Sequence, residues 1–207
     1  MNPPTPDPLE KLLRTPTADL DRTFAAARAR FAARAVSEGV AAVAYEDHDT
    51  PIGAIRLGAT PHGIVRVALP NEDPDAVLEE LARALSPRIL HAHNPRLTSA
   101  RRELDEYFAG DRRAFDVDLD WSLARRFRRD VLRATARIPY GQTSTYRAVA
   151  TQAGSPRAVR AAGTAVATNP LPILVPCHRV VRSDGALGAY RGGSATKSQL
   201  LELEHAL

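Results

Sequence analysis

A proline-rich stretch around the only cysteine restricts the fold of this chain more than any other feature. Three prolines stand in residues 170–176, directly before Cys177. Each proline fixes its own φ and moves the preceding residue away from the helical region, so we predict a rigid, extended segment there. A rigid backbone gives a reactive side chain a defined orientation. We therefore expect Cys177 to be held in a fixed direction at the end of this segment.

The neighbours of Cys177 suggest chemistry. A cysteine reacts as its thiolate, which nearby positive charge or an adjacent base makes available near neutral pH. His178 and Arg179 follow the cysteine, Pro176 precedes it and Asn169 lies close by in the sequence. A lone cysteine in an apolar segment is more often an inert part of the core. The combination of Pro176, His178 and Asn169 favours a nucleophile over that alternative.

The length of 207 residues suffices for one large domain or two small ones. Four prolines in the first eight positions, followed by loosely helical spacing of apolar residues, suggest a frayed start and then helix. The apolar positions are Leu9, Leu12, Leu13, Leu20, Phe24 and Phe31. We expect three parts: a partly helical extension (1–35), an N-terminal α/β domain (36–118) and a C-terminal domain (119–207).

Residues 38–70 have the pattern of a small antiparallel sheet. Apolar runs at 40–45, 52–57 and 64–69 predict three strands, and residues 46–51 predict a turn between the first two. Helices are expected at 75–85, after Asp73-Pro74, and at about 98–108. Residues 116–120 alternate in polarity, which fits either a strand or a linker.

The second half is predicted to be helical. Helices are expected at 123–136, 143–153 and 157–167, and the last two are joined at Gly154-Ser155-Pro156 in the outline of a helix-turn-helix. Any two helices with a tight turn give that outline. Residues 119–207 hold 13 Lys+Arg and 5 Asp+Glu, a net of +8, whereas the first 118 carry −4. This asymmetry favours a polyanionic partner for the second half, the alternative being a solvated arginine-rich surface.

Several protein classes are excluded. No apolar run reaches the roughly 18 to 20 residues of a membrane span. The N-terminus lacks the pattern of a secretory signal, and one cysteine cannot form an internal disulfide. We therefore expect a cytoplasmic protein that makes no membrane contact. We also expect no metal, because the candidate histidines show no convincing ligand spacing. These histidines are His48, His62, His91 and His93.

Residues 176–180, Pro-Cys-His-Arg-Val, resemble the active-site signature of the 6-O-methylguanine-DNA methyltransferases. The resemblance runs from about Phe127 to Glu204, and residues 104–110 look like the segment before the family's interdomain linker. It includes Tyr140-Gly141, Tyr146, the arginine-bearing helix at 157–167, Asn169-Pro170, residues 188–193, Lys197 and Leu200-Leu201.

The resemblance implies an α+β fold. Its N-terminal part would be ribonuclease-H-like, with a three-stranded antiparallel sheet and helices. Its C-terminal part would be mostly helical and winged-helix-like, with a helix-turn-helix. The implied activity is single-turnover DNA repair, without a cofactor, on double-stranded DNA that carries alkylated guanine. A base is flipped from the duplex and its alkyl group passes from the 6-oxygen of guanine to Cys177, with the 4-oxygen of thymine as an open second substrate. A monomer is expected.

The resemblance also implies residue roles. His178 would act as a base towards Cys177 through a water, Glu204 would orient His178, and Tyr146 would give a proton to the departing guanine. Arg160 would enter the duplex and fill the space of the flipped base. Other DNA-binding positions are Arg157, Ala158, Ala161, Gly163 and Thr145. The substrate pocket would involve Asn169, Val180, Tyr190, Arg191 and Lys197.

Three alternatives compete with this function. Related proteins without the cysteine bind alkylated DNA as non-enzymatic damage sensors, and the presence of Cys177 argues against that class. An alkylation-sensing transcription regulator would need a further domain, for which residues 1–35 are too few. A cysteine hydrolase would need direct contact between Cys177 and His178, which adjacent residues of an extended segment do not favour. Arg191 and Thr164 depart from the family pattern, and Arg191 bears on which alkyl groups fit.

Overall fold

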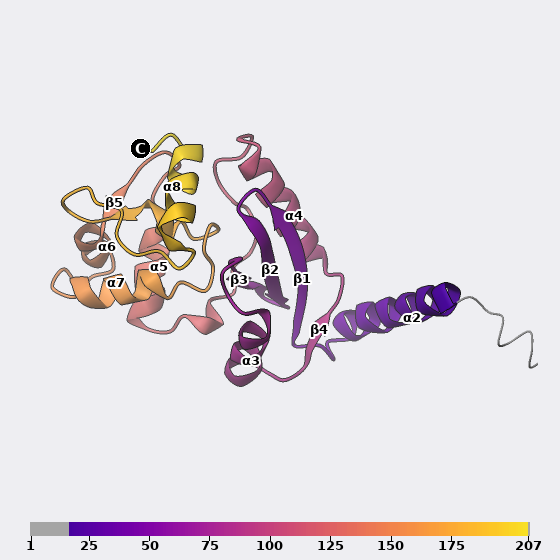
Figure 1. The fold of residues 1–207 in the computed structure, drawn as a ribbon. Helices are drawn as coiled ribbons and strands as arrows, with labels where there is room; N and C mark the ends of the chain where they lie inside the picture. The colour runs from indigo at the N-terminus through magenta and orange to yellow at the C-terminus, as the bar shows by residue number, and fades with distance from the viewer. Residues whose placement is uncertain (1–16, 207) are drawn as a thin grey trace, which may run out of the picture.

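The computed structural model describes residues 17–206, and side chains from residue 21 onward. A sheet with two helices forms one half of the molecule, and a cluster of short helices forms the other half beside it (Figure 1). The helix α2 (Thr17–Ser37) extends away from this body (Figure 1). The predicted α+β class is confirmed.

The N-terminal sheet has four strands in the order β3-β2-β1-β4. Their bounds are β1 (Val43–Thr50), β2 (Gly53–Thr60), β3 (Gly63–Ala68) and β4 (Ile89–His91). The first three form the antiparallel sheet that the apolar runs predicted. The fourth strand pairs parallel with β1 and was not predicted, because a strand of three residues carries too little pattern.

The turn predicted at residues 46–51 is wrong in its position. Residues 46–50 continue β1, and the chain reverses between Thr50 and Gly53, whose φ is +108°. The polar residues that suggested a turn lie on the strand and pair across it. The carboxylate of Asp47 accepts hydrogen bonds from the guanidinium of Arg56 at 2.7 and 2.9 Å. Cross-strand charge pairs of this kind stabilise a solvent-facing strand that lacks an apolar run.

Two helices with side-chain caps accompany the sheet. They are α3 (Pro74–Ala84) and α4 (Pro95–Phe108). Asp73 accepts hydrogen bonds from the amides of Asp75 and Ala76, and Asn94 accepts one from the amide of Arg96. In both helices the cap residue is followed by proline at the first position, where a missing amide hydrogen costs nothing. The α4 helix packs against β1, β2 and β3.

The C-terminal half is built from short elements. They are η1 (Trp121–Leu123), α5 (Phe127–Thr135), β5 (Ser144–Thr145), α6 (Tyr146–Gln152), α7 (Val159–Ala167), η2 (Cys177–Arg179), β6 (Val180–Val181) and α8 (Gly193–Leu203). Three predicted helices begin two to four residues later than expected. The helix α6 starts late because Ser144 and Thr145 pair with β6 and the Thr145 hydroxyl caps the helix. A tight turn with Gly154 at φ +78° joins α6 to α7.

The two halves share apolar contacts and backbone hydrogen bonds. One buried cluster contains Ile64 and Leu69 from the N-terminal side and Leu171 and Leu200 from the C-terminal side. The stretch predicted as strand or linker runs beside β3, where Asp118 accepts a hydrogen bond from the amide of Ile64 at 2.8 Å. A methyl group on Gly63 would meet that carbonyl at 2.5 Å, so the approach requires glycine. The core therefore couples the position of the C-terminal half to the sheet.

The helix α2 is attached to the body through its last turns. Ala32 and Ala35 are buried, whereas Phe24 and Phe31 are 67% and 68% exposed. The predictions for Leu9, Leu12 and Leu13 lie outside the described residues. Within residues 17–206, no helix has both the length and the apolar character needed to cross a lipid bilayer.

Candidate active site

Asn169 organises the proline-rich segment that leads to Cys177. This buried side chain donates from Nδ2 to the carbonyl of Val175 at 2.9 Å and to the Sγ of Cys177 at 3.1 Å. Its Oδ1 accepts from the amide of Leu171 at 3.0 Å. The segment is also tied to the sheet, because the amide of Val67 in β3 donates to the carbonyl of Pro170 at 2.8 Å. The backbone before the cysteine is thus fixed from two sides.

The expected extended conformation of this segment is wrong. The chain makes consecutive tight turns, in which the amide of Val175 donates to Leu171 and the amide of Cys177 donates to Val175. Ile173 adopts a φ of +73°, and Cys177 begins the 3₁₀ turn η2. Prolines exclude regular helix but permit turns, so buried amides find local carbonyls instead. The objection to a hydrolase based on an extended backbone therefore loses its geometric basis.

Burial dominates the electrostatics of Cys177. The residue is 1% exposed and belongs to the apolar cluster of the C-terminal half, together with Val149, Ala162 and Val180. Burial raises the pKa of its thiol to about 11, against the opposing hydrogen bond from Asn169. At neutral pH the resting thiol is therefore protonated. A reaction at this sulfur needs a group that takes the proton.

His178 is held by Glu204, which lies at the C-cap of α8. The His178 Nε2 lies 2.8 Å from the Glu204 Oε1, and both side chains are fully buried. Burial lowers the pKa of His178, and Glu204 opposes that shift. The His178 Nδ1 is buried and has no hydrogen-bond partner among the described residues. One ring nitrogen is fixed by a carboxylate and the other stays available for proton transfer, which suits a base.

Two further side chains fix the carboxylate of Glu204. Arg179 donates from Nε at 2.7 Å and from an Nη at 2.9 Å, and the Tyr107 hydroxyl donates at 2.6 Å. Burial by itself raises the pKa of Glu204, but the hydrogen bonds from His178 and Arg179 outweigh it and lower the pKa to about 2. Sequence reasoning named Arg179 only as a positive charge next to Cys177 and assigned no role to Tyr107. Their presence in the matched motifs was the available signal, and only the fold brings Tyr107 to Glu204.

The loop of residues 182–192, the pocket loop, is held beside the cysteine by hydrogen bonds to its backbone. The Nζ of buried Lys197 donates to the carbonyl of Val180 at 2.6 Å and to that of Leu187. Burial lowers the pKa of Lys197 to about 8. The Tyr146 hydroxyl donates to the carbonyl of Ala189 at 3.5 Å, and burial raises the pKa of Tyr146. These predicted site residues support the loop through its backbone.

Tyr190 lies near both Cys177 and His178. Its ring packs against the apolar cluster that contains Cys177 and stands edge-on to the His178 ring at a centroid distance of 6.4 Å. The Tyr190 hydroxyl is buried without a hydrogen-bond partner among the described residues. The predicted pocket residues Asn169, Val180, Tyr190 and Lys197 thus surround the cysteine. The Arg191 side chain instead pairs with Glu72 of the N-terminal half.

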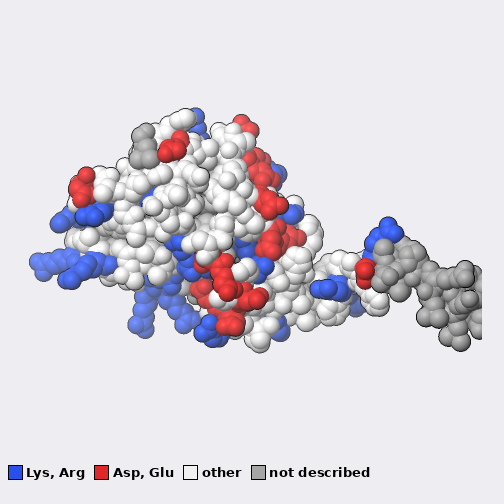
Figure 2. All heavy atoms as spheres, in the orientation of Figure 1, with Lys and Arg blue, Asp and Glu red and all other residues white. Residues whose placement is uncertain are grey.

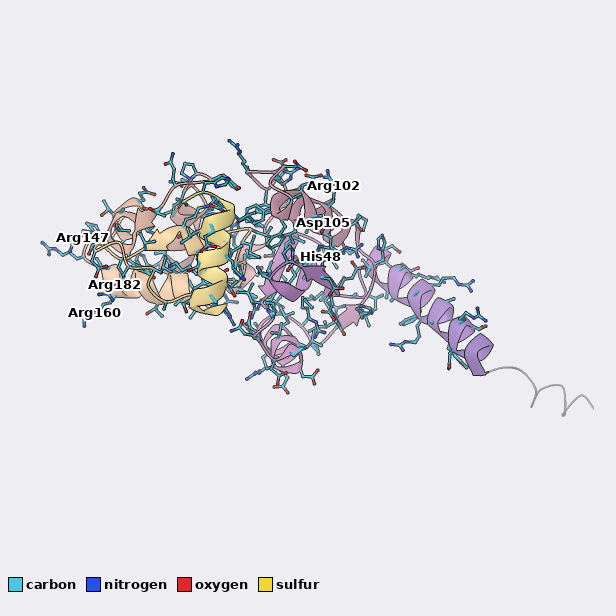
Figure 3. All side chains as sticks on the ribbon, turned by 45° about the horizontal axis from the view of Figure 1, so that its top comes forward. His48, Arg102, Asp105, Arg147, Arg160 and Arg182 are labelled. Atoms are coloured by element: carbon cyan, nitrogen blue, oxygen red, sulfur yellow. The ribbon has the colours of Figure 1, made fainter. Side chains whose placement is uncertain are left out.

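The predicted DNA-binding residues fall into two groups. Arg157, Arg160 and Ala161 are exposed, at the turn before α7 and on its first turn. The others lie in structural positions. The Thr145 hydroxyl caps α6, Ala158 occupies the N-cap position of α7 without a side-chain hydrogen bond, and the half-buried Gly163 faces the ring of Tyr146. Two further arginines, Arg147 and Arg182, project with Arg160 from the same end of the molecule (Figure 3).

Charge is segregated over the visible face of the molecule. Basic atoms gather around the C-terminal half, and acidic atoms gather over the N-terminal half (Figure 2). Within residues 21–206, none of Arg147, Arg157 and Arg160 forms an ion pair, and all three are exposed. In the same part of the chain, no group of three or more His, Cys, Asp and Glu side chains could hold a metal ion.

Comparisons with known proteins match both halves of the chain. The family profile described as 6-O-methylguanine DNA methyltransferase, ribonuclease-like domain, matches residues 43–121. The profile for the DNA-binding domain of the same family matches residues 126–206. The chain is 37% identical to the constitutive methylated-DNA–protein-cysteine methyltransferase of Bacillus subtilis, over 77% of this chain and 94% of that protein. Its identity to the Mycobacterium tuberculosis protein of the corresponding name is 40%, over 77% and 91%.

A solved structure agrees with these matches. The crystal structure of Mycobacterium tuberculosis OGT in complex with DNA superposes with a TM-score of 0.66 at 34% identity. The superposition covers 79% of this chain and 93% of that one.

Proposed function

The chain belongs to the 6-O-methylguanine-DNA methyltransferase family, and from this premise we propose that it repairs DNA by direct alkyl transfer to Cys177. It is a methylated-DNA–protein-cysteine methyltransferase whose substrate is alkylated guanine in double-stranded DNA. The observation that carries the proposal is the buried chain of contacts from Glu204 to His178, next to the only cysteine. The relative crystallised with DNA supports a duplex as the partner.

The first step is removal of the thiol proton. Because burial raises the pKa of Cys177, the resting sulfur is a protonated and poor nucleophile. We propose that the proton passes through a water to the free Nδ1 of His178. Glu204, which stays ionised because its pKa is about 2, stabilises the charged imidazole that results. The Arg179 and Tyr107 contacts keep the carboxylate in place during this change of charge.

The second step transfers the alkyl group. The sulfur forms a bond to the alkyl carbon while the bond from that carbon to the 6-oxygen of guanine breaks. Its electrons move into the departing guanine, which takes up a proton from Tyr146 in our assignment. The thioether at Cys177 has no leaving route, so each molecule acts once. Cys177, His178, Glu204 and Tyr146 are the catalytic residues of this proposal.

Exposed arginines of the C-terminal half would bind the DNA. Arg157 and Arg160, with Ala158, Ala161, Gly163 and Thr145 around them, form the proposed interface. The small residues allow close approach to the duplex. Arg160 would fill the space left by the flipped base, where a planar guanidinium can stack and donate hydrogen bonds. We further propose a cytoplasmic monomer, and alkylated thymine, with its alkyl group on the 4-oxygen, is a second candidate substrate from which the group would pass to Cys177.

Intact-protein mass spectrometry tests the reaction. The protein is incubated with a short duplex that contains one 6-O-methylguanine, and Cys177→Ala is treated in parallel. We expect the wild type to gain one methyl group, mapped to Cys177, and to stop there, while the variant gains none. Binding of the lesion duplex without any mass gain would contradict alkyl transfer. It would favour the alternative function, that of a non-enzymatic sensor of DNA damage.

A further inference from the structure

The Arg191 side chain links the pocket loop to the N-terminal half. Its Nε lies 2.7 Å from the Glu72 Oε2, and its backbone carbonyl accepts a hydrogen bond from the Asn71 side chain at 2.9 Å. Arg191 directly follows Tyr190, the residue whose ring packs beside the cysteine. A contact at Arg191 therefore acts on the part of the loop nearest the reacting atoms.

Glu72 is itself held by hydrogen bonds from other residues of the N-terminal half. The buried Arg66 donates to Glu72 Oε2 at 2.5 Å, and the amide of Leu69 donates to Oε1 at 2.8 Å. Burial by itself raises the pKa of Glu72, but these hydrogen bonds and the charges of Arg66 and Arg191 leave it below its usual value. The N-terminal half thus presents an oriented, ionised carboxylate to Arg191. The pair is largely shielded from water, with side-chain exposures of 25% for Arg191 and 11% for Glu72.

Close packing reinforces the link. A methyl group added to Gly192 would lie 2.9 Å from the Cδ1 of Leu69 and 2.9 Å from the ring of Tyr190. The loop backbone is therefore pressed between a side chain of the N-terminal core and the tyrosine of the pocket. A displacement of the 69–72 segment would move Tyr190.

The remaining attachments of the loop come from the C-terminal half. Lys197 holds the carbonyl of Leu187, and Tyr146 contacts the carbonyl of Ala189. Both of these contacts hold the loop at residues that precede Tyr190, whereas the Glu72 contact holds it at Arg191, the residue that follows Tyr190. Without the Glu72 contact, Arg191 would keep the Asn71 hydrogen bond to its carbonyl and a longer ion pair with Glu80 at 3.9 Å. The residues after it would keep the Gly192 packing and hydrogen bonds made within the C-terminal half.

We propose that Glu72 and Arg191 are positioning residues through which the N-terminal half sets the width of the alkyl pocket. The inference rests on the proposed function, because it concerns the pocket in which the alkyl group meets Cys177. With the pair intact, Tyr190 is held close and small alkyl groups are favoured. Without it, the loop opens, larger groups enter and the sulfur becomes more accessible to reagents.

The first test compares alkyl groups of different size. Two duplexes, one with 6-O-methylguanine and one with 6-O-benzylguanine, are reacted with the wild type and with Arg191→Ala. The second-order rate of mass gain is measured for each. We expect the benzyl-to-methyl rate ratio to rise about tenfold in Arg191→Ala, the size of change expected when a partly shielded ion pair is lost. Arg191→Lys keeps the charge and should restore much of the wild-type ratio.

The second test needs no DNA. Cys177 is the only cysteine, so mass gain from iodoacetamide reports its accessibility without ambiguity. We expect faster alkylation in Arg191→Ala than in the wild type. The matched control is Arg83→Ala, which removes an arginine–glutamate pair between exposed side chains on α3. This variant should change neither the benzyl-to-methyl rate ratio nor the rate of iodoacetamide alkylation.

A double variant tests whether the two residues act through each other. Glu72→Gln combined with Arg191→Ala should change the rate ratio no more than the larger single change. Because Glu72→Gln also weakens the Arg66 contact, its thermal unfolding is measured first, and Arg191→Ala carries the test if that variant is unfolded. Unchanged ratios and unchanged iodoacetamide rates in Arg191→Ala would overturn the inference. A wild type without methyl transfer, but with faster iodoacetamide reaction in Arg191→Ala, would refute the proposed function and leave the loop inference standing.

Discussion

Two groups of charged residues in the C-terminal half differ in their access to water. Around Glu204, the side chains of His178 and Arg179 are 0% and 6% exposed and every charge has a partner. At the outer end of the same half, Arg147, Arg157 and Arg160 are exposed and form no ion pair within the described residues. Buried charges need partners to compensate for lost hydration, whereas exposed unpaired charges remain ready for a polyanion.

The difference in exposure indicates that the two groups of charged residues have different roles. The buried group maintains a fixed geometry, so its disruption should affect folding as well as proton transfer. The exposed group should affect DNA affinity with little effect on folding.

Glu204→Ala should produce the largest effect. It leaves His178 and Arg179 buried without their carboxylate, which costs about 3–5 kcal/mol when one partner of a buried pair is removed. Chemical denaturation gives the change in the free energy of unfolding. The matched control is Glu202→Ala, an exposed position on the same helix, for which we expect a change within about 0.5 kcal/mol. Equal effects of the two variants would show that the Glu204 contacts contribute nothing.

The pH dependence of stability should expose the same carboxylate. The pKa of Glu204 is about 2 in the folded protein against an ordinary 4.5. A lowered folded pKa gives stability that is fully present above pH 4.5 and is lost as the pH falls towards 2. The loss is about 3 kcal/mol from the size of the shift. Thermal midpoints of the wild type should therefore fall more steeply than those of Glu204→Gln over this interval, and parallel curves would contradict the assignment.

Arg160→Ala should reduce methyl transfer from duplex DNA without unfolding the protein. A stacked side chain in the duplex is worth about 1–3 kcal/mol, which corresponds to roughly a tenfold to hundredfold loss in rate. The iodoacetamide rate at Cys177 should not change. Arg102→Ala is the control, because Arg102 lies on α4 of the N-terminal half, well away from Arg160 (Figure 3). An equal loss in both variants would remove the special role of Arg160.

Arg157→Ala should have the smallest effect. An arginine that neutralises one phosphate contributes about one unit to the slope of log affinity against log salt concentration. Titrations of an undamaged duplex at several salt concentrations measure that slope. We expect it to decrease by about one in the variant, with the thermal midpoint unchanged. A slope that matches the wild type would place Arg157 outside the interface.

The N-terminal half shows where local pattern succeeds and fails. The runs that became β1, β2 and β3 were identified from their apolar character, because strands packed on a core must bury apolar side chains. The polar end of β1 was mistaken for a turn, since its stability comes from a cross-strand pair with Arg56. The strand β4 was missed because three residues of pattern are too few. Both errors concern elements that depend on a partner distant in sequence.

In the candidate site, too, local features were predicted from the sequence and contacts between distant segments were not. Cys177, His178 and the surrounding prolines identified a nucleophile by themselves, because residue chemistry and backbone restriction are local properties. The family resemblance, which the comparisons confirm, added Glu204, Tyr146 and Arg160 as expectations. Neither source gave the turns of the 171–177 segment, because these depend on which buried amides find which carbonyls.

The sequence by itself determined the composition of the site, the family and the basic character of the second half. Only the tertiary structure decided which charges are paired. Tyr107 and Glu204 are 97 residues apart, and Glu72 and Arg191 are 119 residues apart, yet each pair is in hydrogen-bond contact. Such contacts depend on how the two halves pack around their shared apolar core. Because hydrophobic packing is not directional, the positions of these polar partners follow from the complete fold and cannot be inferred from any local segment.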